Sequence, residues 1–204
     1  MNNYEYIIAC LPVLRPEDSR SPDSLDAAEL IDEIRGQLSA RDAAVLDTLL
    51  AGYDPAQMNE AFYRQALRHR DRFIREWFAF DLDLRNTATA FLNRSLGRPD
   101  GQDQILPAER EEAEFPEQEA VEAVLNDTDI LRRERALDDL RWRKIEELTM
   151  MDWFDLDAIL GFVARLKIID RWLRLDPDSG RTFFRRLVED IQSTYENKKQ
   201  TITI

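Results

Sequence analysis

Two stretches of the chain place a Trp shortly before the same four residues, Phe-Asp-Leu-Asp. The residues of the two copies are Trp77, Phe80, Asp81 and Asp83 in the first, and Trp153, Phe154, Asp155 and Asp157 in the second. Paired carboxylates could hold Mg²⁺, as they do in several all-α phosphohydrolases. Ligands of one ion on a helix stand three or four residues apart, however, whereas each of these pairs is two apart and projects to nearly opposite sides. The spacing therefore favours a structural unit used twice over a metal site within one motif.

Arginines one turn further along offer these acidic residues a simpler role. Asp81 precedes Arg85 by four residues, and Asp170 precedes Arg174 by four, which is the favourable order for an ion pair within a helix. We expect both pairs to form. The metal alternative stays open only if carboxylates come from different helices, such as Asp81 with Asp157.

Other catalytic chemistry has little support in the sequence. His69 is the sole histidine and has no Glu-x-x-His pattern around it, so a surface position is expected. Cys10 is the sole cysteine, which excludes a thiolate metal cluster and an intramolecular disulfide. No Gly-x-Ser-x-Gly motif and no glycine-rich phosphate loop occurs. We expect a protein without cofactor, metal or catalytic residues.

A basic stripe is the strongest binding signal. Arg64, Arg68, Arg72 and Arg75 follow one another at steps of four, four and three residues in a chain of net charge -13. Intramolecular ion pairs would explain the stripe, and so would a docking face for an acidic protein partner, because the forked donors of arginine orient as well as attract. Both interpretations stay open.

The elements that must position these residues are predicted to be helices. Apolar residues recur at three- and four-residue steps from about 24 to 38, 39 to 52, 129 to 151 and 155 to 173, with a weaker helix over 117 to 125. Residues 55 to 96 contain no internal Pro or Gly and predict one long helix, straight or bent. Residues 4 to 14 predict a short extended segment, and a final helix should end near Asn197. The helix over 155 to 173 is apolar on most sides and should lie in the middle of a bundle.

These elements predict a mainly α, multi-helix bundle with an internal duplication. Residues 1–97 would form an N-terminal helical unit that contains the long helix, and residues 117–204 a C-terminal one, packed as one domain. The acidic, Pro- and Gly-containing stretch 98–116 would be a linker or mobile loop.

Charge and hydropathy limit the partners. The charge of -13 opposes binding to nucleic acid or to an anionic membrane surface. The longest apolar stretch is far shorter than the roughly 20 residues of a membrane span. We expect a cytoplasmic protein that reaches a membrane only through a complex.

The chain resembles a bacterial family found with the subunits of V-type ATPases. The resemblance lies in "NNYEYIIACLPVL", "FAFDLDLRN" and above all "LRWRKIEELTMMDWFDLDAILGFVARLKIIDRWLRLDPDSGRTFFRRLVEDI". That family looks like a shortened relative of the C-type rotor protein of V-type ATPases, whose eukaryotic counterpart is the d-type one. The resemblance implies a helical, non-catalytic rotor component that seats the central shaft on the membrane proteolipid ring. The C-type protein carries three related helical units, whereas two Phe-Asp-Leu-Asp copies occur here, and no contact residues transfer from it.

Three functional hypotheses follow, in order of preference. The first is a central-stalk rotor component of a V-type ATPase or ATP synthase whose partners are the shaft subunits and the proteolipid ring. The second is a helical scaffold unrelated to ATPases. The third is a Mg²⁺-dependent all-α phosphohydrolase. Under the first, we expect both Trp77 and Trp153 to be buried at helix crossings.

Overall fold

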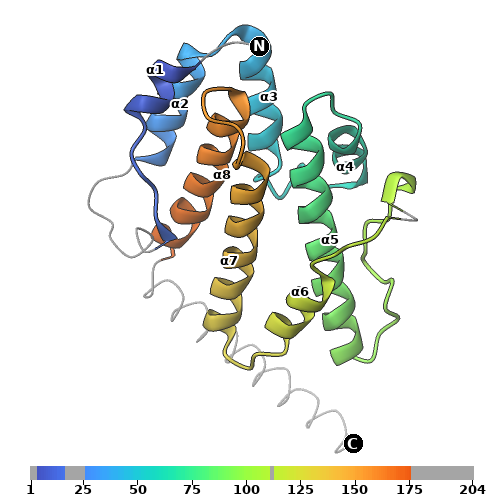
Figure 1. Ribbon diagram of the computed structural model, residues 1–204. Coiled ribbons are helices and arrows are strands. Elements are labelled where there is room, and N and C mark those ends of the chain that lie inside the picture. Colours follow the sequence, from blue (N-terminus) through green and yellow to red (C-terminus); the bar gives the residue numbers. More distant parts are fainter. Residues whose placement is uncertain (1–3, 17–25, 111–112, 176–204) are drawn as a thin grey trace, which may run out of the picture.

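The protein folds as a bundle of helices. The structure is a computed structural model that describes residues 4–16, 26–110 and 113–175, and within them every regular element is helical. The elements are α1 (Glu5–Cys10), α2 (Ala27–Gln37), α3 (Ala40–Ala51), α4 (Glu60–Leu67), α5 (Arg72–Ser95), η2 (Ala108–Arg110), α6 (Gln118–Leu125), α7 (Ile130–Thr149) and α8 (Leu156–Leu173) (Figure 1). The predicted all-α fold class is confirmed. The predicted final helix lies outside the described residues.

Helix α8 occupies the middle of the bundle, as its all-round apolar sequence predicts. It packs against α7 on one side and against α2 and α3 on the other (Figure 1). Six consecutive residues of α8, Ile159 to Ala164, are buried. Gly161 allows α7 to approach closely, because a Cβ at this position would lie 2.4 Å from Thr149 Cγ2.

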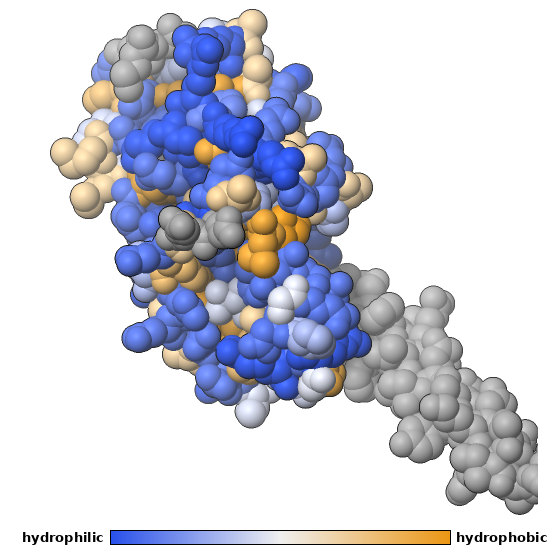
Figure 2. All heavy atoms as spheres, turned by 90° about the vertical axis from the view of Figure 1, so that its right-hand side faces the viewer, coloured by the Kyte–Doolittle hydropathy of each residue, from blue (hydrophilic) through white to orange (hydrophobic). Residues whose placement is uncertain are grey.

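Helix α5 joins the two predicted units. It packs against α4 and α3 of the N-terminal unit and against α6 and α7 of the C-terminal unit. Buried hydrophobic residues from α1 to α8 form one core cluster. Figure 2 shows the face that carries α4 and α5, where hydrophilic residues cover most of the surface and hydrophobic ones gather in a small central cluster.

Side-chain caps fix where most helices begin. Ser39, the predicted cap, accepts a hydrogen bond from the Asp42 N–H at 3.2 Å at the start of α3. Asp129 and Asp155 accept from backbone N–H groups in the first turns of α7 and α8. Each cap satisfies a backbone donor that the helix itself leaves unpaired, which is why these predicted starts are confirmed.

Two predicted elements are wrong. Residues Glu5–Cys10 form a short helix rather than an extended segment, and it ends just before Pro12. The predicted single helix over 55 to 96 is two helices, because the chain turns between Arg68 and Asp71. Asp71 caps α5 by accepting from the Ile74 N–H at 3.1 Å. Arg75 donates to the carbonyl groups of residues 69 and 70, both at 2.9 Å, and so stabilises the turn.

The described parts of the predicted linker lie along α5. Asn86 receives a hydrogen bond from the Ile105 N–H at 3.1 Å and donates to the Ile105 carbonyl at 2.7 Å. Asn93, which is buried, donates to the carbonyl groups of Asp100 and Gln102. Backbone bonds from α5 therefore position this segment.

None of the helices in the described residues combines the length and the apolarity that a membrane crossing requires.

Candidate functional site

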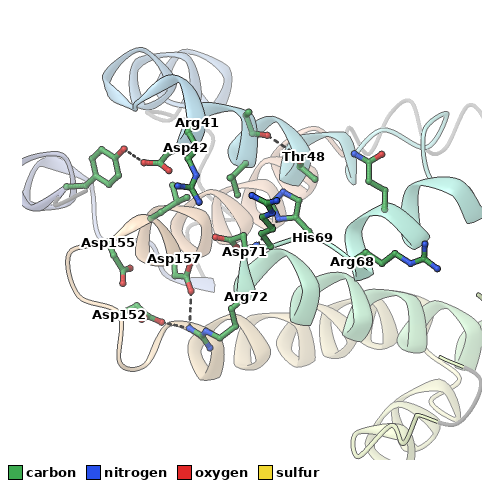
Figure 3. Close-up of a pocket in the computed structure, with 16 residues that line it drawn as sticks. Arg41, Asp42, Thr48, Arg68, His69, Asp71, Arg72, Asp152, Asp155 and Asp157 are labelled. Atoms are coloured by element: carbon green, nitrogen blue, oxygen red, sulfur yellow. Dashed lines mark hydrogen bonds and ion pairs between the residues drawn. The ribbon is translucent and has the colours of Figure 1, made fainter. Parts of the chain in front are cut away.

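A polar cleft of about 1070 Å³ opens where three distant parts of the chain meet. Its walls come from α3, from the turn between α4 and α5, and from the loop between α7 and α8 (Figure 3). Arg41 and His69 point into the cleft from one side, and Asp152, Asp155 and Asp157 lie on the other. The cleft therefore has a cationic wall and an anionic wall.

Arg72 connects these walls and acts as a latch. Its guanidinium donates to Asp152 Oδ2 at 2.6 Å, to Asp157 Oδ2 at 3.0 Å and to the carbonyl oxygen of Leu148 at 2.9 Å. These acceptors lie at the end of α7, in the following loop and in the first turn of α8. One arginine at the start of α5 therefore holds both ends of the α7–α8 loop.

Burial shifts the acid–base behaviour of the anionic wall. Burial raises the pKa of Asp157 to about 6, the negative charge of Asp71 adds to the rise, and the positive charge of Arg72 opposes it. The pKa of Asp152 is raised as well, first by burial and then by the charge of Asp155. Carboxylates crowded in a partly dry site hold protons more tightly because their repulsion disfavours the charged forms. The cleft consequently contains a carboxyl group that titrates just below neutral pH.

The α7–α8 loop exposes large apolar side chains beside this cleft. Met150 is 68 % exposed, Met151 77 %, Trp153 71 % and Phe154 50 %. The backbone of this loop is nevertheless anchored, because the Tyr4 N–H donates to the Phe154 carbonyl at 2.8 Å opposite the Arg72 latch. We call residues 150–154 the apolar loop. Met151, which the sequence assigns to the buried stripe of the preceding helix, is thus a correction.

The two Phe-Asp-Leu-Asp copies differ in their surroundings. Trp77 and Phe80 are buried in the middle of α5, whereas Trp153 and Phe154 are exposed in the apolar loop. The expectation that both tryptophans are buried at helix crossings is therefore wrong for Trp153. The reason is helix register, because the first copy lies inside a helix and the second immediately precedes one.

The aspartates of the two copies differ in the same way. Asp81 is buried, accepts from the Tyr63 hydroxyl at 2.8 Å and pairs with Arg85 at 2.7 Å, as the four-residue spacing predicts. Asp83 pairs with Arg110 of η2, and burial raises its pKa while Arg110 opposes the rise. Asp155 is the cap of α8, by contrast, and Asp157 binds Arg72.

The second predicted intrahelical pair also forms, with Arg174 Nε 2.8 Å from Asp170 Oδ1. Asp81 does not line the cleft that contains Asp157. Among residues 4–16, 26–110 and 113–175, no group of three His, Cys, Asp or Glu side chains could hold a metal ion. The geometry therefore gives the combination of Asp81 with Asp157 no support as a shared metal site.

The four arginines of the predicted stripe do not share one helix. Arg64 lies on α4 and pairs with Glu60, and Arg68 ends α4 and pairs with Glu109. Arg72 and Arg75 belong to α5, where the first is the latch and the second bonds to the turn. In Figure 3, Arg68 points away from the latch. The single stripe is therefore wrong, and a docking role for these arginines stays a prediction that intramolecular contacts do not favour.

Several residues of the cleft escaped sequence reasoning. Arg41, Asp42, Asp71 and Asp152 line it but belong to no recognisable motif. His69, the expected surface histidine, is half-buried in the cleft, and its Nδ1 accepts the Asp71 N–H at 3.1 Å. The one signal available in advance was the run Met-Met-Asp-Trp-Phe, which is too apolar for a connecting loop unless something covers it.

Comparison with known proteins finds similarity to one family. Residues 110–195 match the family described as "Protein of unknown function (DUF2764)". The matched segment includes α6, α7, the apolar loop and α8. Among curated proteins and among solved structures, none matches this chain.

Proposed function

We propose that this protein is a non-catalytic helical adapter, and specifically a central-stalk rotor component of a V-type ATPase or ATP synthase. In this role it couples the shaft to the membrane proteolipid ring from the cytoplasmic side. The sequence resemblance described above supports the specific role. The all-α bundle is compatible with it.

The observation that carries the adapter function is the apolar loop. Two methionines, a tryptophan and a phenylalanine are exposed within five residues, on a backbone held by Arg72 and Tyr4. Leaving such side chains in water is unfavourable, and contiguous apolar surface on a folded protein marks an interaction site. Tryptophan is also over-represented among the residues that dominate binding energy at protein interfaces.

The cleft by itself supports adapter binding better than catalysis. Asp152 and Asp157 accept hydrogen bonds from Arg72, and Asp155 caps α8. These bonds stabilise helix ends and position the apolar loop. Catalysis would instead require a nucleophile, a base and a group that orients the base within reach of one another.

Purification of the V-type complex from cells that contain a tagged chain at native level tests the proposal. We expect the chain to copurify with shaft and proteolipid subunits and to form cross-links to them. A chain that elutes apart from these subunits, without cross-links, would overturn the rotor assignment.

A titration with Mg²⁺ or Mn²⁺ separates the adapter from the phosphohydrolase hypothesis. A ligand that binds only the folded state must raise the unfolding temperature. We expect no rise at millimolar ion, and a clear rise together with hydrolysis of a phosphate ester would favour the enzyme instead.

A further inference from the structure

We propose that the apolar loop, residues 150–154, is the docking point for a basic segment of a partner protein that also carries apolar side chains. This inference rests on the proposed adapter function and adds the chemistry of the partner.

The charge around the apolar loop selects the partner. Between Ile145 and Ala164 the chain contains five carboxylates and no Lys or Arg. Within the described residues, the cations that form ion pairs with these carboxylates are Arg72 and Lys144. The loop is therefore surrounded by more negative than positive charge, and a basic partner would neutralise the excess.

The same charge disfavours other occupants. A second copy of the chain would bring the same acidic surroundings face to face with the first, and like charges at an interface cost several kcal/mol. Phosphates of nucleic acid or of an anionic lipid surface would be repelled for the same reason. A basic protein segment satisfies both the apolar and the electrostatic requirement.

The anchored backbone makes the loop suited to binding. Arg72 ties Leu148, Asp152 and Asp157 together on one side, and Tyr4 bonds to the Phe154 carbonyl on the other. The backbone is thus held while the side chains remain exposed. Binding then costs less conformational entropy than it would for a free loop.

A synthetic amphipathic helix of Lys and Leu serves as a probe that does not depend on any ATPase. Trp77, Trp142 and Trp172 are buried, so acrylamide should quench mainly Trp153 in the free protein. We expect the Lys/Leu helix to protect Trp153 from acrylamide and added salt to weaken the binding. A matched helix with Glu in place of Lys should give no protection.

Calorimetry on two double variants locates the binding surface. Met151→Ala/Trp153→Ala should weaken binding of the Lys/Leu helix by roughly 30-fold, the loss typical of an aromatic hot spot. Ile130→Ala/Leu131→Ala removes apolar residues of similar exposure at the other end of α7 and should leave binding unchanged. Equal binding of the Glu helix, or unchanged affinity of the loop variant, would overturn the inference.

The same variants in the cellular complex separate the two proposals. If the wild type enters the V-type complex and the loop variant does not, both proposals are supported. If both enter equally, the docking point is wrong while the rotor function stands. If the wild type does not enter, the rotor function fails and the peptide measurements decide the docking inference.

Discussion

Replacement of the two motif tryptophans by alanine should have opposite consequences for stability. Trp77 is 2 % exposed and stacks between Phe73 and Phe80, with ring centroids 6.4 and 6.0 Å away. A buried tryptophan removes roughly 200 Å² from water, worth about 5 kcal/mol at 25 cal/mol per Å². Alanine retains part of this, so Trp77→Ala should cost about 3 to 5 kcal/mol of unfolding free energy.

Trp153→Ala should change the unfolding free energy by only about 0.5 kcal/mol, because its side chain is already mostly in water. Urea denaturation followed by far-ultraviolet circular dichroism measures both variants against the wild type. Similar slopes against urea would show that the transitions are comparable. A cost above about 2 kcal/mol for Trp153→Ala would mean that the loop packs against the bundle in solution, and would refute its assignment as a free surface.

Three further substitutions test the energetics of the bundle. Asp138→Ala should cost about 3 to 5 kcal/mol, because this buried carboxylate accepts hydrogen bonds from two arginines and the Trp172 indole, whereas the exposed neighbour Asp139→Ala should cost little in the same urea melts. Burial raises the pKa of Asp157 to about 6, above its ordinary 3.8, so the folded protein binds this proton more tightly than the unfolded chain and loses stability as pH rises from about 4 to 6. Asp157→Asn should therefore raise the unfolding midpoint at pH 7, with the gain vanishing below about pH 4; an equal gain at both pH values would contradict the shift. Gly161→Ala should cost about 1 to 3 kcal/mol through contact with α7, whereas Gly36→Ala, which meets no atom within 4 Å in α2, should gain about 0.5 to 1 kcal/mol; thermal melts that reverse this order would contradict the packing.

Local chemistry made most helices predictable from the sequence. Ser39 and Gly52 mark the two ends of α3, and both positions have the expected capping roles. The all-round apolar pattern of α8 predicted its central position, because a helix with no polar face must be covered on every side. The ion pairs of Asp81 and Asp170 followed from their four-residue spacing, which depends only on helix geometry.

The break between α4 and α5 shows where such reasoning fails. The turn contains neither Gly nor Pro, so it carries no strong sequence signal. It forms because Asp71 can cap a new helix and because Arg75 bonds to two carbonyl groups of the turn. These contacts compete with continued helix only when the tertiary structure directs the chain aside. The cleft was unpredictable for the related reason that it combines α1, α3, the α4–α5 turn and the α7–α8 loop.

The repeated Phe-Asp-Leu-Asp motif has its two roles because aspartate acts differently inside a helix and at its start. Inside α5, Asp81 is buried and needs partners, which Tyr63 and Arg85 supply. Ahead of α8, Asp155 accepts the Ala158 N–H and starts the helix, which leaves the preceding Trp153 outside it. A tryptophan placed before a capping aspartate is carried by a loop, and in this protein Arg72 and Tyr4 fix that loop at the surface. The same four letters thus support the core in one copy and present an interaction surface in the other.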